Sequence, residues 1–153
     1  MDIHTMPGHL IRRLNQISVA LFMDQMEQAG VSLTPVQFAA LSAIQEKPGI
    51  DQATVAGMIA YDRATLGKVI DRLDARGLVA RSKSRKDRRS KELTLTSEGA
   101  ALLKEALPFV KKVQPAILAG LSDAERDVIV DLLQKTTKAG NDHSRAPLTT
   151  PDQ

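Results

Sequence analysis

The sequence contains no cysteine, so disulfide bonds, thiol catalysis and thiol-based redox sensing are excluded. Its three histidines, His4, His9 and His143, do not have the spacing of metal ligands. No nucleophile motif is present either, which argues against an enzyme and against a metal or other cofactor. No apolar run approaches the roughly 20 residues that a membrane-spanning helix needs, and the first residues lack the basic-then-apolar order of a signal peptide. We therefore expect a cytoplasmic protein without a cofactor.

The size and charge of the chain point to one domain with a local basic patch. At 153 residues and 42% hydrophobic content, it can bury a real core. The segment 81–91, RSKSRKDRRSK, holds seven basic residues and one acidic residue, a net of +6 in a chain of net charge +3, so all other residues together carry −3. Such concentrated charge predicts a surface for an anionic partner. A membrane fits less well, because the patch lacks flanking aromatic and apolar anchors.

Periodicity and capping signals divide the chain into a small central lobe between long helices. We predict an N-terminal arm over residues 1–7, a central lobe over 33–96 and a disordered tail over 140–153, where no periodicity is found. Long helices are expected in 8–32 and 97–139, because apolar residues recur there at three- and four-residue steps. The first of these helices has a broad apolar face that could serve a partner subunit.

The central lobe has the pattern of a winged helix-turn-helix. Three helices are expected in it, and the last two, over 52–59 and 63–75, are joined by a tight turn. Two short strands follow, over 78–83 and 92–96, with the basic residues at the tip between them. The predicted fold class is therefore mainly α (α+β), a winged helix-turn-helix flanked by long helices.

The helix over 63–75 is suited to the major groove of DNA, because one side is apolar and the other is basic and hydrogen-bonding. The loop between the strands can then reach phosphates or the minor groove, where arginine inserts readily. The candidate DNA contacts are Arg63, Thr65, Lys68 and Arg72 in the helix and Arg81, Lys83, Arg85, Lys86, Arg88 and Arg89 in the wing. Two alternatives stay open: Thr65 could serve as a capping residue, and the basic run could be a solvated charge cluster.

The central lobe resembles the MarR family of bacterial transcription regulators. The residues that carry the resemblance are LTPVQFAALSAI, over 33–44, and DRATLGKVIDRLDARGLVARSKSRKDRRSKELTLTSEG, over 62–99. It covers about residues 8–140 and implies an obligate homodimer, held by the long dimerisation helices, on a pseudo-palindromic operator in double-stranded DNA. It also implies that Asp87 pairs with a nearby arginine to fix the wing, while Arg89 enters the minor groove. The alternative for Asp87 is a surface ion pair of little energetic value.

The opening PGHLIRRLNQISVALF is similar to the branch of that family that regulates the breakdown of nicotinate and other aromatic acids. Many members release DNA when a small aromatic acid binds between the dimer helices and the DNA-binding lobe. Such a pocket needs a cation for the carboxylate and apolar walls. The candidate effector residues are His9, Arg13, Phe38, Met58 and Tyr61. Two simpler alternatives are that Arg13 pairs with an acidic residue across the dimer and that Tyr61 is a buried turn residue.

We therefore expect a sequence-specific, dimeric DNA-binding regulator, a repressor that is released by a small aromatic carboxylate such as a hydroxynicotinate or a benzoate. The alternative is a winged-helix protein that binds DNA without any ligand, in an architectural role. Binding to one or a few operators would separate the two, as would thermal shifts with aromatic acids, because a ligand that binds the native state stabilises it.

Overall fold

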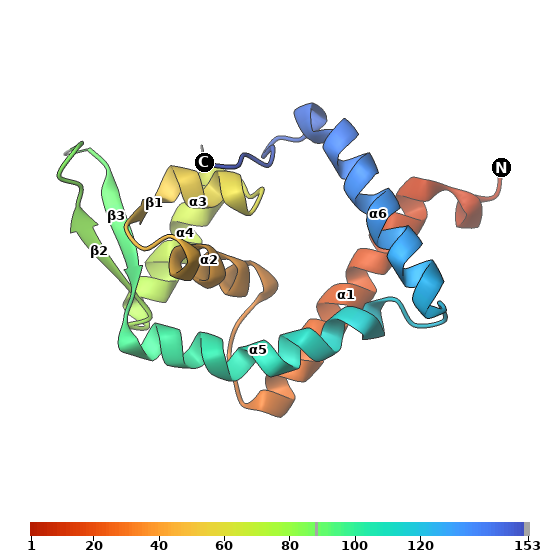
Figure 1. Ribbon diagram of the computed structural model, residues 1–153, viewed down its shortest axis with the longest axis horizontal. Coiled ribbons are helices and arrows are strands. Elements are labelled where there is room, and N and C mark those ends of the chain that lie inside the picture. Colours follow the sequence, from red (N-terminus) through yellow and green to blue (C-terminus); the bar gives the residue numbers. More distant parts are fainter. Residues whose placement is uncertain (88, 152–153) are drawn as a thin grey trace.

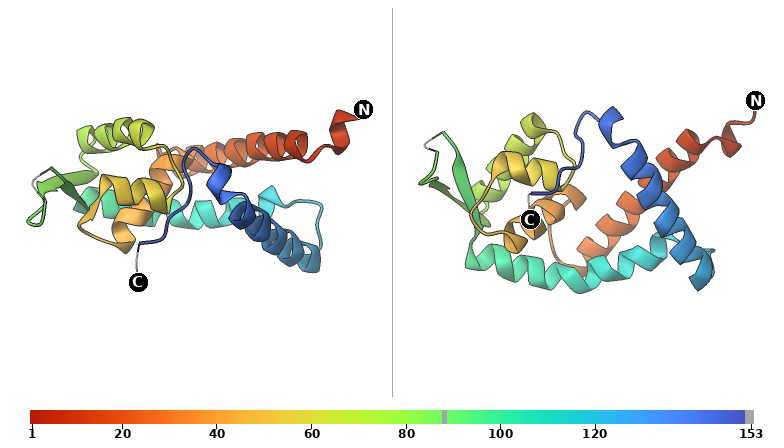
Figure 2. Two further views of the ribbon diagram at one scale, coloured as in Figure 1. Left: turned by 90° about the horizontal axis from the view of Figure 1, so that it is seen from above. Right: turned by 45° about the horizontal axis from the view of Figure 1, so that its top comes forward.

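The computed structural model describes residues 1–87 and 89–151, and it confirms the predicted fold class (Figure 1). Two long helices, α1 (Pro7–Ala29) and α5 (Ser97–Ile117), pack against each other below a smaller lobe. The last long helix, α6 (Asp123–Ala139), stands apart from that lobe (Figure 2). The remaining elements are η1 (Ile3–Thr5), α2 (Pro35–Glu46), β1 (Ile50–Asp51), α3 (Gln52–Met58), α4 (Arg63–Ala75), β2 (Val79–Lys83), β3 (Lys91–Leu95) and η2 (Asn141–His143). No helix in the described ranges combines the length and apolarity needed to cross a membrane.

The hydrophobic core extends from the lobe into the contact between α1 and α5. Phe22 and Met26 of α1 are buried there, as are Leu103 and Val110 of α5. The fully buried side chains of the lobe include Leu41, Ile44, Val55, Leu66, Ile70, Leu73, Val79 and Leu93. Burying one such large side chain stabilises a fold by roughly 1.5–3 kcal/mol. The packed core of the lobe therefore fixes the positions of the helices and strands that carry its surface residues.

A three-stranded antiparallel sheet in the order β1-β3-β2 closes the lobe. β2 and β3 form the predicted hairpin, in which Val79 lies opposite Leu95. The sequence analysis did not anticipate β1, because two residues are too few for a periodic signal. This strand exists through its pairing with β3, where Ile50 lies opposite Leu93. The hairpin is thereby tied to the helical part of the lobe.

Side-chain caps fix where the helices begin. Thr34 starts α2 with a capping box completed by Gln37, and Ser122 starts α6 with one completed by Glu125. Asp62 caps α4 by accepting a hydrogen bond from the backbone of the third helical residue. The first turn of α4 therefore has a defined position, which sets the directions of its side chains.

Gly99 allows α5 to approach the base of the hairpin. It is buried, and a β-carbon at this position would overlap the backbone carbonyl of Leu78. The same junction is held by Thr96, whose N–H donates to the carbonyl of Leu78 at 3.1 Å and whose hydroxyl donates to the carbonyl of Gly77 at 2.6 Å. Because backbone meets backbone here, the hairpin has little freedom to move relative to α5.

The segment over 140–153 was expected to be disordered, and the structure differs over the part that it describes. η2 follows α6 directly, and the side chain of Asn141 then forms two hydrogen bonds with the backbone of Leu148. Further on, the N–H of Thr149 donates to the carbonyl of Gly57 in α3. These partners are far apart along the chain, so periodicity could not reveal the contact.

Candidate nucleic-acid interface

The predicted outer face of α4 is exposed to solvent. On its inner side, Leu66, Ile70 and Leu73 are fully buried. The four predicted contacts on the outer side are exposed: Arg63, Thr65, Lys68 and Arg72. The predicted orientation of the helix is therefore confirmed, whereas contact of these side chains with DNA remains a prediction.

Thr65 also has the capping role that was considered as its alternative. Its N–H and its hydroxyl both donate to the carboxylate of Asp62, at 3.0 and 2.9 Å. The backbone hydrogen bond from Thr65, followed by the bond from its hydroxyl, holds the pKa of Asp62 below its ordinary value of 3.8. Because the hydroxyl proton is used in the cap, Thr65 can offer a nucleic acid only its acceptor lone pairs.

The wing tip is organised around Ser84 and Asp87. The hydroxyl oxygen of Ser84 accepts hydrogen bonds from the backbone of Lys86 and of Asp87, at 3.2 and 3.3 Å. The carboxylate of Asp87 accepts one from the backbone N–H of Arg89 at 2.9 Å. Asp87 thus shapes the turn that presents Arg89. The implied ion pair between Asp87 and an arginine side chain is not found among residues 1–87 and 89–151.

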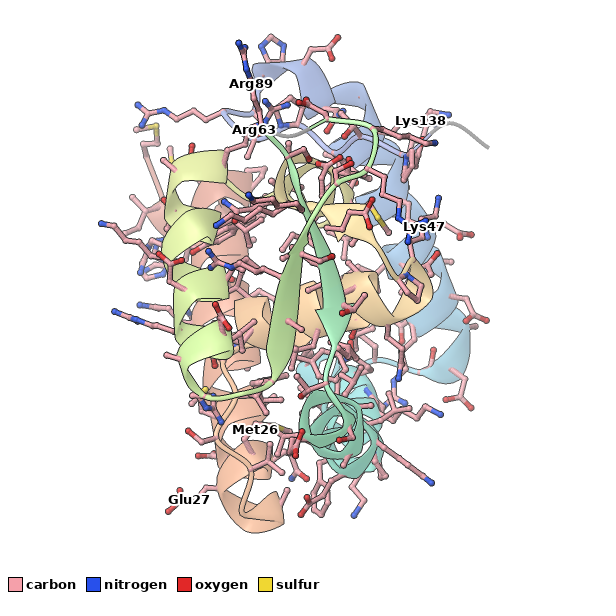
Figure 3. All side chains as sticks on the ribbon, turned by 90° about the vertical axis from the view of Figure 1, so that its left-hand side faces the viewer. Met26, Glu27, Lys47, Arg63, Arg89 and Lys138 are labelled. Carbon is pink, nitrogen blue, oxygen red and sulfur yellow. The ribbon has the colours of Figure 1, made fainter. Side chains whose placement is uncertain are left out.

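Arg63 of α4 and Arg89 of the wing line one open hollow, which also touches α3 at Gln52. Figure 3 shows the side chains of Arg63 and Arg89 near each other. The structure therefore brings the first residue of α4 and the wing tip together on one surface. The exposed basic residues of the described part of the wing are Lys83, Arg85, Lys86, Arg89 and Lys91. Arg88, the remaining predicted contact near the tip, lies outside the described residues.

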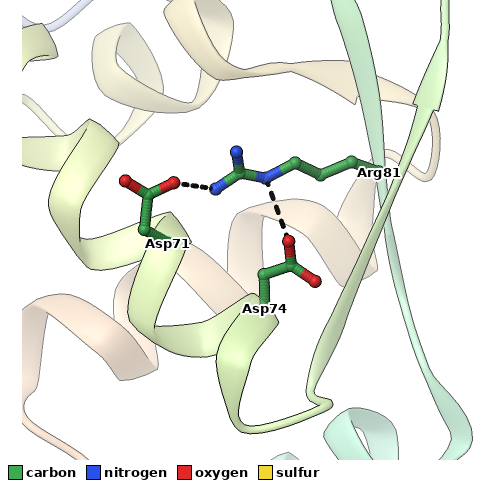
Figure 4. A network of polar contacts seen from close by, with 3 residues as sticks. All are labelled: Asp71, Asp74 and Arg81. Carbon is green, nitrogen blue, oxygen red and sulfur yellow. Dashed lines mark hydrogen bonds and ion pairs between the residues drawn. The ribbon is translucent and has the colours of Figure 1, made fainter.

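Arg81 is directed toward α4 instead of the wing tip (Figure 4). Its Nη2 lies 2.5 Å from Oδ1 of Asp71, and its Nε lies 3.6 Å from Oδ2 of Asp74. The Arg81 side chain is 21% exposed. Arg81 also lines the hollow that Arg63 and Arg89 share. Its predicted contact with DNA remains a prediction, and the two ion pairs show that it also joins the wing to α4.

Asp71 and Asp74 were not among the predicted site residues. Their spacing of three places them on one side of the helix, and Arg81 follows a short distance along the chain. That pattern was visible in the sequence, but the crossing of β2 over α4 was needed to show which carboxylates Arg81 meets. Across residues 1–87 and 89–151, no three His, Asp or Glu side chains gather closely enough to hold a metal ion.

Two of the predicted effector residues, Phe38 and Tyr61, line different hollows of the chain. Phe38 lines an apolar groove between α2 and α5, together with Leu103 and Leu107. Tyr61 lines a separate hollow beside the C-terminal segment, and Met58 packs against the core. The other two predicted residues, His9 and Arg13, lie in the first turns of α1 and line neither cavity.

Comparison with known proteins places this geometry among transcription regulators. Residues 33–91 match the model of the MarR family. Over 134 residues, the chain is 34% identical to the HTH-type transcriptional repressor NicR of Pseudomonas putida, and the match covers 88% of this chain and 84% of that protein.

Two solved structures are similar over almost the whole chain. One is BpsR of Bordetella bronchiseptica, whose DNA binding is regulated by 6-hydroxynicotinic acid; it is 37% identical, with a TM-score of 0.84 over 90% of this chain and 96% of that one. The other is the PcaV transcriptional regulator of Streptomyces coelicolor in complex with its natural ligand; it is 34% identical, with a TM-score of 0.83 over 92% of this chain and 97% of that one.

Proposed function

This chain belongs to the MarR family of transcriptional regulators, and on that premise we propose that it is a dimeric, sequence-specific repressor that a small aromatic carboxylate releases from its operator. Such a repressor works in the cytoplasm, alongside the chromosome. The observation that carries the proposal is the hollow shared by Arg63 and Arg89, because it brings the amino end of α4 and the basic wing to one surface.

In the proposed complex, α4 lies in the major groove. Lys68 and Arg72 are exposed donors suited to the acceptor atoms of guanine, and a good bidentate contact contributes roughly 1–3 kcal/mol of discrimination between bases. Thr65, whose proton is committed to Asp62, is suited to the amino group of adenine or cytosine. The buried inner face of the helix keeps these side chains in place.

The wing is proposed to meet the backbone and the adjacent minor groove. Lys83 lies directly opposite Lys91 in the hairpin, and both are exposed. Like charges facing each other across two strands destabilise a hairpin, unless an anion lies between or beside them. A row of phosphates supplies that anion. Arg89, presented by the Asp87 turn, is the side chain proposed to enter the minor groove.

The dimer is proposed from apolar surface that a single chain leaves exposed. None of the residues of α6 is buried. Large hydrophobic side chains are exposed at Leu10, Ile11, Ile17, Val19 and Met23 of α1 and at Val128, Val130, Leu132 and Leu133 of α6. A second copy of this chain would cover both helices at once. It would also place two α4 helices on one duplex, as a pseudo-palindromic operator requires.

The effector is proposed to bind where the second copy approaches the lobe. The apolar groove beside Phe38 offers walls for an aromatic ring but lies apart from His9 and Arg13 of the same chain. We propose that the amino end of α1 from one subunit supplies the cation for the carboxylate, and that the lobe of the other supplies the apolar wall. BpsR and PcaV, at 37% and 34% identity, are regulators with a bound or regulating small molecule, which supports a small-molecule effector for this chain.

The experiment is a titration of the protein with the DNA upstream of its own gene, against scrambled DNA, at two salt concentrations. A panel of hydroxynicotinates and benzoates is added to each titration. Tight, salt-sensitive, sequence-specific binding that one acid abolishes would support the repressor. Binding to operator and scrambled DNA alike, untouched by every acid, would instead support the architectural alternative.

The Arg89→Ala variant tests the role of the wing in that assay. It should weaken binding to many sequences alike and lower the slope of log affinity against log salt by about 0.9, the contribution of one phosphate contact. Lys111→Ala, an equal change of charge on the exposed side of α5, is the control and should leave the slope unchanged. Wild-type affinity for Arg89→Ala would refute the proposed wing contact.

A further inference from the structure

The C-terminal segment returns from the end of α6 to the DNA-binding lobe (Figures 1 and 2). Its path is closed by Asn141, whose side-chain amide donates to the carbonyl of Leu148 at 3.0 Å and accepts from the N–H of Leu148 at 2.8 Å. The next residue, Thr149, donates its N–H to the carbonyl of Gly57 at 2.9 Å. The segment is therefore fastened at both ends, first to itself just beyond the C-terminal end of α6 and then to α3.

The absence of a side chain at Gly57 leaves room for this segment. It lies in the last turn of α3, where a side chain other than hydrogen would ordinarily favour the helix. A β-carbon at Gly57 would overlap the hydroxyl oxygen of Thr149, and the other atoms closest to it also belong to Thr149. A β-carbon at position 57 would therefore collide first with the C-terminal segment.

The same contact places Arg145 beside the amino end of α4. Arg145 is exposed and lines a hollow together with Tyr61, Asp62 and Arg63. Its positive charge helps to keep the pKa of Asp62 low, after the larger contributions of the hydrogen bonds from Thr65. The N-terminal residues of a recognition helix are those that approach the bases and the phosphates beside them. Arg145 is thus carried to the surface that DNA would meet.

We propose that residues 141–149 form a strap that ties α6 to the last turn of α3 and holds Arg145 as an additional phosphate contact beside Arg63. This inference rests on the proposed DNA-binding function. The strap also links a helix of the proposed dimer interface to the DNA-binding lobe of the same chain. Its two parts, the strap and the phosphate contact, can be measured separately.

The strap is tested without DNA, by amide hydrogen exchange in the full-length protein. The N–H of Thr149 should exchange slowly in the wild type and much faster in Gly57→Ala, while the core amides of α4 stay protected. If Thr149 accommodates a methyl group by rotating its side chain, Gly57→Leu still displaces it. Gly8→Ala, at an exposed helical glycine with nothing within 4 Å of the added carbon, is the control and should not change the exchange of Thr149. Rapid exchange of Thr149 in the wild type would overturn the strap.

The phosphate contact is tested by operator binding across a range of salt. Arg145→Ala should lower the salt slope by about 0.9 and weaken affinity about fivefold near 0.15 M salt, as expected for one lost phosphate contact. Gly57→Leu should cause the same loss, because it displaces the strap that carries Arg145. The double variant Gly57→Leu/Arg145→Ala should bind no more weakly than either single variant. Lys111→Ala should again have no effect on the slope.

The two proposals fail in different ways. A wild-type slope for Arg145→Ala would overturn the phosphate contact, even if the strap is protected. Additive losses in the double variant would show that Arg145 contributes to DNA binding whether or not the strap is displaced, which overturns the proposal that the strap holds Arg145 in place. If the wild type binds no operator, the proposed function fails together with the role of Arg145, while slow exchange of Thr149 would still establish the strap.

Discussion

Gly99 shows at the scale of one residue how a backbone contact constrains this fold. An added β-carbon would meet the carbonyl of Leu78, which belongs to the backbone and cannot rotate away. Gly99→Ala should therefore destabilise the protein by about 1–3 kcal/mol, the usual cost of overpacking a core. Urea denaturation measures this change. Gly8→Ala, with open space around the added carbon, should be neutral or stabilising by up to about 1 kcal/mol; similar losses in both variants would contradict the explanation.

The exposure of single residues was predictable from the sequence, whereas their partners were not. Helical periodicity correctly put Lys68 and Arg72 on the outside of α4. It could not show that the proton of the Thr65 hydroxyl belongs to Asp62, or that Arg81 turns toward Asp71. The hydrogen-bond or ion-pair partner of a side chain depends on how closely two elements approach in space, and a pattern along the sequence carries no such distances.

At the scale of elements, the contact of β2 with α4 predicts an effect whose sign separates two roles of Arg81. If Arg81 bound a phosphate, replacing Asp71 and Asp74 by asparagine would free its side chain, remove two negative charges near DNA and strengthen binding. If Arg81 positions the wing by holding these carboxylates, the same double substitution should weaken operator binding. We expect the weaker binding, with a stability change of at most about 1 kcal/mol because all three side chains are partly exposed.

Operator titration and thermal denaturation of the same preparation measure both quantities. The control is Asp24→Asn/Glu27→Gln, which removes two exposed negative charges from α1, outside the lobe. Stronger operator binding by the Asp71→Asn/Asp74→Asn protein than by this control would return Arg81 to the list of direct DNA contacts.

The helix caps predict how stability depends on pH. Hydrogen bonds at the starts of three helices hold the pKa values of three carboxyl groups low. The pKa of Asp62 is lowered by hydrogen bonds from the backbone and the hydroxyl of Thr65. The pKa of Glu98 is lowered by hydrogen bonds from its own backbone N–H and from the Ser97 side chain, and that of Glu125 by hydrogen bonds from the backbone and side chain of Ser122. A lowered folded-state pKa means that the unfolded chain takes up protons first. The stability that these groups add is therefore complete above their ordinary values of 3.8 and 4.5, and it is lost as the pH falls through the lower folded values.

Thermal melting between pH 7 and 3 measures this dependence. The melting temperature should decrease once the pH is lowered past about 4.5. Glu125→Gln removes one titrating group while keeping a side chain that can complete the capping box. It should melt slightly below the wild type at pH 7, because it lacks the stabilisation of the ionised carboxylate, and it should lose less on acidification. Ser122→Ala removes the cap itself and should cost about 1 kcal/mol at pH 7. An acid dependence that Glu125→Gln leaves unchanged would show that this cap is not the source.

The order and type of the main elements were predictable because their signals are local. Capping residues, apolar spacing and the alternation of the hairpin all lie within one segment of sequence. β1 and the course of residues 141–151 were missed because each depends on a distant partner, Leu93 in one case and Gly57 in the other. The effector site is even harder to predict from the sequence, because its two proposed halves belong to different subunits.

At the scale of the whole molecule, the exposed apolar side chains of α6 are explained by association with a second subunit. Val128 and Leu132 are both 56% exposed, and they lie four residues apart on one side of the helix. In an isolated chain, Val128→Asp/Leu132→Asp would be a surface change worth at most about 0.5 kcal/mol at each position. In a dimer held by α6, the same change buries unpaired charges and should drive the subunits apart.

Sedimentation equilibrium should therefore give a dimer mass for the wild type and a monomer mass for Val128→Asp/Leu132→Asp. Operator affinity should fall steeply in the variant, because one lobe then makes half of the contacts. Gln134→Asp, an exposed polar position on the same helix, should change neither property. The wild-type melting temperature should also rise with protein concentration, since association stabilises only the folded state. A dimeric double variant would show that α1 and α5 hold the subunits together without α6, and a monomeric wild type bound to its operator would overturn the dimer itself.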